Sequence, residues 1–220
     1  KEFYHVGQEL AATELTRLNY PPNIFPSEVP EFANATITAY RTLEAAGVQI
    51  LRAIALYLQL EENYFDRQVK LGNSILRPIH YFPINNPQDI PVDAVRAGAH
   101  GDINLITLLM GASAEGLEIL RQDGNWIPLT ALPNQIVVNV GDMLERLTNK
   151  KLRSTIHRVV NPPQGFWDTP RYSIPFFMHP VSEMDLSCLA ECIDEQHPKK
   201  FDDLTAGEFL TQRLREIGLI

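Results

Sequence analysis

The chain has 220 residues, of which 45% are hydrophobic and 21% are charged, and its formal net charge is −8. These values are typical of a soluble globular protein, and no run of about 18 apolar residues predicts a membrane span. The negative charge argues against broad contact with nucleic acid or anionic lipid, which require clustered Lys and Arg. We therefore expect a small-molecule partner, no nucleic-acid or membrane partner, and a single domain over residues 1–220.

Before about residue 72 the apolar residues recur at helical spacing. The clearest stretch runs from Pro30 to about Leu60 and predicts a long amphipathic helix with a break near Gly47. A shorter helix is expected in EENYFDRQV, residues 61–69. The first part of the chain, 1–72, is therefore predicted to be helical.

From residue 73 to 181 the pattern changes to short alternating segments of β type. The first is SILRPIHYF at 74–82, and Asp123-Gly124 is a strong hairpin signal between two later segments. The other segments are NLITLLM, GLEILR, NWIPL, QIVVNV, STIHRVV and RYSIPFFM. Antiparallel strands at this spacing predict a mainly β fold, a barrel or jelly roll with flanking helices.

The last part, 182–220, returns to a helical pattern. Thr205 is a candidate N-cap, and Glu208 three residues later completes a capping box before an amphipathic segment. Two cysteines, Cys188 and Cys192, lie in this part with a spacing that does not suit a zinc knuckle. We interpret them as free thiols, which together with the lack of a signal peptide predicts a reducing cytoplasmic location.

Candidate metal ligands occur in two β-like segments. In AGAHGDINLITLL, His100 and Asp102 are two positions apart, so on a strand they would share one face. His157, in STIHRVV, supplies a second imidazole. Two imidazoles and one carboxylate leave open positions on a metal, as in non-haem Fe(II) oxygenases. An H-x-D pair alone is more often a surface or core histidine beside a turn aspartate.

A candidate anion site follows fourteen residues after His157. In RYS, Arg171 and Ser173 share a strand face, and a guanidinium fork with a hydroxyl is a natural receptor for a carboxylate. The alternative is that Arg171 forms a surface salt bridge of little energetic value. The following IPFF favours a buried strand and therefore the receptor.

Together, HGD, STIHRVV and RYS, with DGNWIPL and VVNVGDMLERLTN between them, resemble the Fe(II)/2-oxoglutarate-dependent oxygenases of the isopenicillin N synthase-like group. The resemblance is strongest over residues 74–180 and implies a double-stranded β-helix, or jelly roll. It implies that His100, Asp102 and His157 are iron ligands and that Arg171 and Ser173 hold the distal carboxylate of 2-oxoglutarate.

The resemblance also places Tyr81, in LRPIHYFP, near the co-substrate, although Ile79 and Phe82 depart from the residues usual there. It further implies that the family's usual N-terminal segment is missing from this chain.

The activity that the resemblance implies is oxidative decarboxylation of 2-oxoglutarate by Fe(II) and O2, coupled to oxidation of a C–H bond. Hydroxylation is the usual outcome, and desaturation or ring closure are the alternatives. Two alternatives stay open: a 2-oxoglutarate-independent oxidase of the same fold, and a catalytically silent member that binds a small carboxylate or a protein. No residue pattern selects the primary substrate or the oligomeric state.

Overall fold

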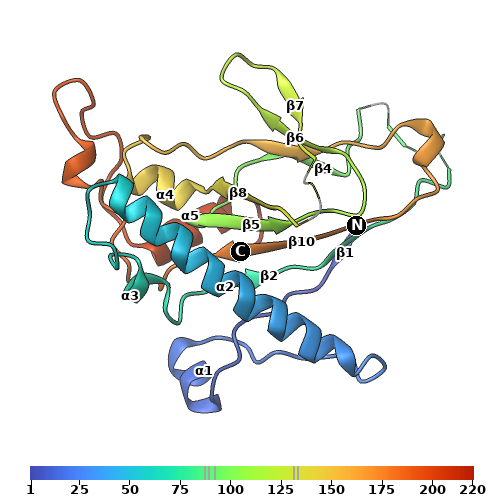
Figure 1. Cartoon of the computed structure of the whole chain (residues 1–220), viewed down its shortest axis with the longest axis horizontal. Coiled ribbons are helices and arrows are strands. Elements are labelled where there is room, and N and C mark those ends of the chain that lie inside the picture. Colours follow the sequence, from blue (N-terminus) through green and yellow to red (C-terminus); the bar gives the residue numbers. More distant parts are fainter. Residues whose placement is uncertain (87, 89, 92, 131, 133) are drawn as a thin grey trace.

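Two antiparallel sheets form the centre of the computed structural model, which describes all residues except 87, 89, 92, 131 and 133 (Figure 1). The larger sheet has the order β1-β3-β10-β5-β8, with β2 also pairing with β10, and the smaller has the order β4-β9-β6-β7. The strands are β1 (Glu2–Phe3), β2 (Ile75–Leu76), β3 (Ile79–Tyr81), β4 (Ala97–His100), β5 (Ile106–Met110), β6 (Leu117–Leu120), β7 (Trp126–Pro128), β8 (Ile136–Val140), β9 (His157–Val159) and β10 (Arg171–Met178). The predicted jelly-roll class is confirmed.

The helices flank the sheets. They are α1 (Ala12–Leu18), α2 (Glu31–Tyr57), α3 (Asp66–Val69), α4 (Asp142–Leu147) and α5 (Ala206–Glu216), with short 3-10 turns η2 (Gln164–Phe166) and η3 (Ala190–Cys192). The capping box at Thr205 and Glu208 is confirmed at the start of α5. Within the described residues, no helix combines the length and apolar character needed to cross a membrane.

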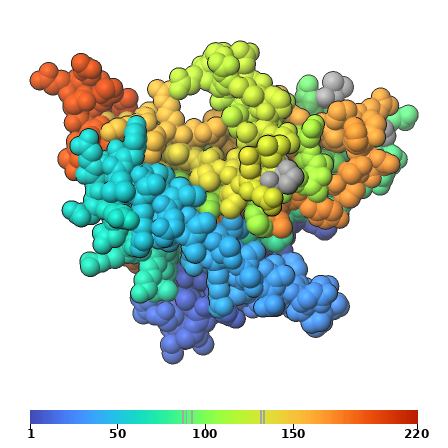
Figure 2. All heavy atoms as spheres, in the orientation of Figure 1, coloured from blue at the N-terminus to red at the C-terminus, as the bar shows by residue number. Residues whose placement is uncertain are grey.

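The long helix α2 crosses the larger sheet, and Figure 2 shows it covering the middle of one face of the molecule. The expected break near Gly47 is wrong, because the helix is continuous through that residue. A Cβ atom at Gly47 would lie 2.5 Å from the sulfur of Met178, so the glycine allows close packing of helix on sheet. The close packing that Gly47 allows offsets the helix propensity that a glycine lacks.

The predicted strand at 74–82 is divided into β2 and β3. Pro78 lies in the gap and lacks the N–H that a continuous ladder would require. The residue before it, Arg77, still donates its backbone N–H to the carbonyl of Pro175. The Asp123-Gly124 hairpin is confirmed: it joins β6 to β7, with Gly124 at a φ of 84°.

The expectation that His100 and Asp102 begin one strand is wrong. His100 is the last residue of β4, and Asp102 lies in the connection from β4 to β5. Strand pairing instead brings His100 opposite His157 on β9. The two imidazoles therefore meet through sheet register, and the carboxylate reaches them from a loop.

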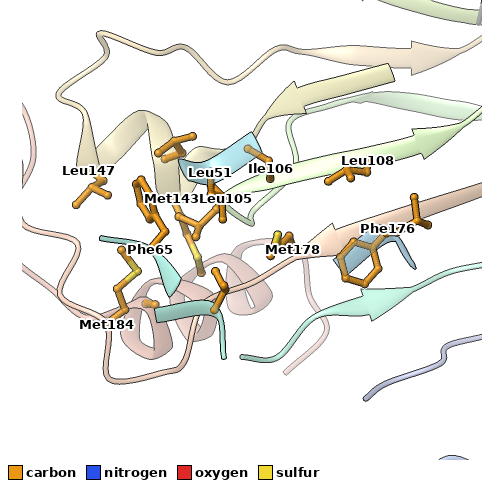
Figure 3. Packing of buried hydrophobic residues seen from close by; sticks show 14 of the residues in the cluster. Leu51, Phe65, Leu105, Ile106, Leu108, Met143, Leu147, Phe176, Met178 and Met184 are labelled. Atoms are coloured by element: carbon orange, nitrogen blue, oxygen red, sulfur yellow. The ribbon is translucent and has the colours of Figure 1, made fainter. Parts of the chain in front are cut away.

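One apolar core joins the three parts of the chain. Leu51 of α2, Leu108 of β5, Met143 of α4 and Phe176 of β10 all belong to this cluster, and Figure 3 shows their side chains along β5 and β10. Phe209 of α5 belongs to the same cluster. We propose on this basis that residues 1–220 form one domain, as the sequence predicts.

Phe176→Ala should strongly destabilise the protein. Its side chain is fully buried and meets the Tyr40 ring edge-on, with a centroid distance of 5.0 Å. Removing a buried phenyl group leaves a cavity and costs about 3–5 kcal/mol in the free energy of unfolding, measurable by denaturant titration. Phe166→Ala is the matched control, because Phe166 is 61% exposed. A similar loss in both variants would contradict the packing described.

His179 should make stability fall at mildly acidic pH. Burial lowers its pKa from 6.5 to about 4, so between these values the unfolded chain binds a proton that the folded chain excludes. Stability is therefore lost as pH falls from about 6.5 to 4, by about 3 kcal/mol at most. Unfolding of His179→Gln at pH 7 and pH 4.5 should show a smaller pH dependence than wild type, and an equal dependence would refute the assignment.

Candidate metal centre

Three predicted ligands meet at the ends of β4 and β9. One ligand atom from each of His100, Asp102 and His157 can be chosen so that all three lie within 4.8 Å of one another. The imidazole rings are 4.4 Å apart between centroids. The Asp102 Oδ1 to His157 Nε2 distance is 3.8 Å, which is too long for a hydrogen bond. The three candidate ligand atoms therefore surround a common point without forming hydrogen bonds to one another.

Both histidines have one ring nitrogen fixed by the backbone. Nδ1 of His100 lies 2.7 Å from the carbonyl oxygen of Gly98, and Nδ1 of His157 lies 3.1 Å from that of Thr155. Because a carbonyl oxygen only accepts, each Nδ1 donates, and Nε2 of a neutral ring keeps its lone pair. Partial desolvation at the cavity wall, then the neighbouring His157, lowers the pKa of His100, although its side chain keeps some contact with solvent. Both effects favour the neutral, metal-binding form.

The Asp102 carboxylate is oriented by two donors on the larger sheet. Thr107 Oγ1 and Asn139 Nδ2 donate to Asp102 Oδ2 at 2.6 and 2.9 Å. Asn104 Nδ2 donates in turn to Thr107 Oγ1 at 2.9 Å. This network holds one carboxylate oxygen and leaves Oδ1 directed toward the histidines. Asp102 is only 6% exposed, so its charge is shielded from water.

Arg171 lies in the same cavity as these ligands. It is 1% exposed, and its Nε donates to the carbonyl oxygen of Ala114 at 3.1 Å. Its Nη1 is buried and has no hydrogen-bond partner among the described residues. A buried unpaired guanidinium nitrogen is costly, so this atom favours an anionic ligand. The surface salt bridge considered for Arg171 is not formed in the described structure.

Tyr81 and Ser173 flank Arg171 on the cavity wall. Tyr81 pairs with Arg171 across β3 and β10, and the guanidinium carbon lies 5.1 Å from the phenol ring centroid. Burial raises the pKa of Tyr81, and Arg171 opposes this shift, so the phenol stays a hydrogen-bond donor at neutral pH. Ser173 is buried and lines the cavity two residues along β10. All six predicted site residues thus line one cavity.

Sequence reasoning missed five polar residues of this cavity: Lys1, Arg77, Thr107, Asn139 and Thr155. A usable signal existed for two of them. Thr107 and Asn139 are polar residues inside apolar strands, at positions 107 in NLITLLM and 139 in QIVVNV. Such residues require a buried partner. The sequence did not show that their partner is Asp102. That partner becomes clear only from the pairing of β5 with β8, which sets Thr107 opposite Asn139.

Comparison with known proteins identifies the family of this chain. The model of the 2OG-Fe(II) oxygenase superfamily matches residues 72–180. A crystal structure from Caulobacter crescentus, of a protein assigned to the 2OG-Fe(II) oxygenase family, is 48% identical with a TM-score of 0.88, over 98% of this chain and 69% of that one. The chain belongs to the 2OG-Fe(II) oxygenase superfamily.

Two further proteins of similar sequence are longer than this chain. A full-length Neurospora crassa protein, crystallised in complex with alpha-KG and thymine, is 32% identical with a TM-score of 0.86, over 98% of this chain and 64% of that one. The 2-oxoglutarate-Fe(II) type oxidoreductase hxnY of Emericella nidulans is 32% identical over 96% of this chain and 61% of its own length. The chain thus spans about three fifths of that curated relative.

The cavity fits the cofactors of the superfamily. Two imidazole nitrogens and one carboxylate oxygen suit Fe(II) while leaving positions open. The unpaired Nη1 of Arg171 suits a carboxylate of 2-oxoglutarate.

Asn139→Ala should weaken metal binding. The variant loses one of the two donors that orient Asp102, and such outer-shell losses typically lower metal affinity about 10- to 100-fold. Titration of the apo-protein with Mn(II), followed by electron paramagnetic resonance, measures the dissociation constant. Asn125→Ala, an exposed hairpin position, is the control. An unchanged constant in Asn139→Ala would contradict this role of the amide.

Proposed function

We propose that His100, Asp102 and His157 bind Fe(II) and that the chain carries the oxygenase activity of its superfamily. The observation that carries this proposal is the convergence of three ligand atoms within 4.8 Å of one another in the same cavity as a buried, unpaired arginine nitrogen. A purely structural site would pair these groups with each other. Their separation at 3.8 Å between Asp102 and His157 instead supports a cation between them.

The co-substrate would be 2-oxoglutarate, held at its distal carboxylate by Arg171, Ser173 and Tyr81. Nη1 of Arg171 supplies a charged donor, and the Ser173 hydroxyl lies on the same strand face. The Tyr81 phenol stays protonated at neutral pH because of burial. These three groups would fix the direction of the co-substrate and keep water from its far end.

When bound, Fe(II) and 2-oxoglutarate supply the oxidising chemistry, in which O2 is consumed, the co-substrate becomes succinate and CO2, and a C–H bond of a small-molecule substrate is oxidised, typically by hydroxylation. This chain contributes orientation and exclusion of water. Thr107 and Asn139 keep Asp102 turned toward the metal position. Apolar side chains of both sheets, among them Leu109, Leu117 and Val159, form much of the remaining wall.

Two finer assignments belong to the same proposal. The ordered motifs HGD, STIHRVV and RYS support the isopenicillin N synthase-like group within the superfamily. The two free cysteines, Cys188 and Cys192, support a reducing compartment and hence the predicted cytoplasmic location.

Anaerobic addition of Fe(II) and then 2-oxoglutarate to the apo-protein should give the weak visible charge-transfer band of a keto-acid chelate. Arg171→Lys should raise the 2-oxoglutarate concentration needed for half the band by roughly tenfold or more, because Lys lacks the planar fork. Mn(II) affinity should not change, which separates this effect from misfolding. Arg41→Lys, at an exposed ion pair, is the control. If metal binds but no band forms in wild type, the 2-oxoglutarate-independent alternative is favoured.

Asp102→Ala should abolish succinate formation that depends on Fe(II) and 2-oxoglutarate. The variant removes the one carboxylate among the three candidate ligands and leaves two histidines. Succinate release, measured by chromatography, reports the loss. Turnover at the wild-type rate would refute the assignment of Asp102 as a ligand.

A further inference from the structure

Arg77 faces the same cavity as the metal ligands, and nothing in the proposed binding of Fe(II) and 2-oxoglutarate uses it. It lies between β2 and β3. The register that pairs Leu76 with Phe176 and Ile79 with Ser173 sets Arg77 opposite Pro175, and its backbone N–H donates to that carbonyl. Side chains alternate along the strand, so Arg77 points to the same side as Ile79 and Tyr81.

The guanidinium of Arg77 is supported by uncharged neighbours. Its central carbon lies 4.7 Å from the ring centroid of Phe177 and 5.0 Å from that of Phe3. Its Nε donates to Nε2 of His5 at 2.6 Å. Since Arg only donates, His5 accepts and is neutral there, and both burial and Arg77 lower its pKa. Within the part of the chain that the structure describes, no carboxylate forms an ion pair with Arg77.

The surrounding charges leave this cation uncompensated. Burial lowers the pKa of Arg77, and the strongest opposing effect comes from Asp102, which the proposed function assigns to the metal. A second cation, Lys1, lines the cavity, and its pKa is lowered first by burial and then by Arg77. Lys1 is solvent-exposed and Arg77 is half-buried, and a bound anion would reduce the repulsion between these two cations.

This position is separate from the proposed 2-oxoglutarate carboxylate site. Arg171 and Pro175, the neighbour of Arg77, are four residues apart on β10, so the two arginines extend from backbone positions about 13 Å apart at the rise of an extended strand. Beyond Pro175, β10 continues to Phe177, which lies opposite Thr107 on β5. Thr107 donates a hydrogen bond to the candidate metal ligand Asp102. Arg77 therefore lies at the metal end of the cavity, where a substrate must present its C–H bond.

We infer that the primary substrate is a small molecule with a carboxylate group, which Arg77 binds with help from Lys1, and that this contact sets the position of the oxidised carbon. This inference rests on the proposed function and adds the substrate class. Phe177 would pack on the apolar part of such a molecule while its contact with Arg77 keeps the guanidinium in place. Neutral analogues, which cannot form the charged hydrogen bonds, would bind less tightly.

The test uses matched probes on the chain loaded anaerobically with Fe(II) and saturating 2-oxoglutarate. A panel of aliphatic and aromatic monocarboxylates is compared with the corresponding primary amides, with binding followed by calorimetry and ligand-observed NMR. At least one acid should bind roughly tenfold or more tightly than its amide. In Arg77→Gln this preference should disappear, while Arg77→Lys should retain part of it. Arg41→Gln is the matched control and should behave as wild type.

The charge-transfer band, recorded in parallel, separates the possible failures. The band should persist in Arg77→Gln and on addition of the preferred acid. If the band is normal but no acid is preferred over its amide, or if Arg77→Gln keeps the preference, this inference fails and the proposed function stands. An acid that abolishes the band by displacing 2-oxoglutarate also overturns it. Absence of the band in wild type would refute the proposed function and this inference with it.

Discussion

The pairing of β10 with β3 and β2 on one side and with β5 on the other is the constraint on which both faces of the larger sheet depend. In this register, Phe176 and Met178 point with Leu108 toward α2 and are fully buried. The residues that alternate with them along β10 point the other way. Arg171, Ser173, Pro175 and Phe177 all line the cavity. One strand thus carries the hydrophobic core on one face and the proposed anion site on the other, and a shift by one residue would exchange them.

The charged groups of the cavity are mostly positive, although the whole chain carries a net charge of −8. Arg171, Arg77 and Lys1 line it, whereas Asp102 is the one carboxylate among the lining residues that the structure describes. In a dehydrated space such an imbalance is unfavourable for the empty protein and favourable for acidic ligands. Net charge therefore reports on the outer surface and says little about this interior.

Much of the fold and of the site could be predicted from the sequence, because short strands and turns leave local signals. The Asp123-Gly124 hairpin and the Thr205 capping box depend only on neighbouring residues, and both were predictable. The helix α4 was not predicted, since its six residues are too few to show a clear period. The loop position of Asp102 was also missed, because its polar side chain is stabilised by Thr107 and Asn139 on other elements. Long-range partners of this kind become visible only when strand register is known.

The location of Asp102 outside the β ladders has a consequence for redesign of the centre. Its side chain could be shortened without disturbing a strand, while the histidines stay paired by the register of β4 with β9. Thr107 and Asn139 would then present two hydrogen-bond donors to the vacated space. A small exogenous anion, such as halide or azide, would find there both a cation and oriented donors. The same network that orients the Asp102 carboxylate would therefore make the proposed coordination position exchangeable, and would give the scaffold a place where new metal chemistry can be introduced.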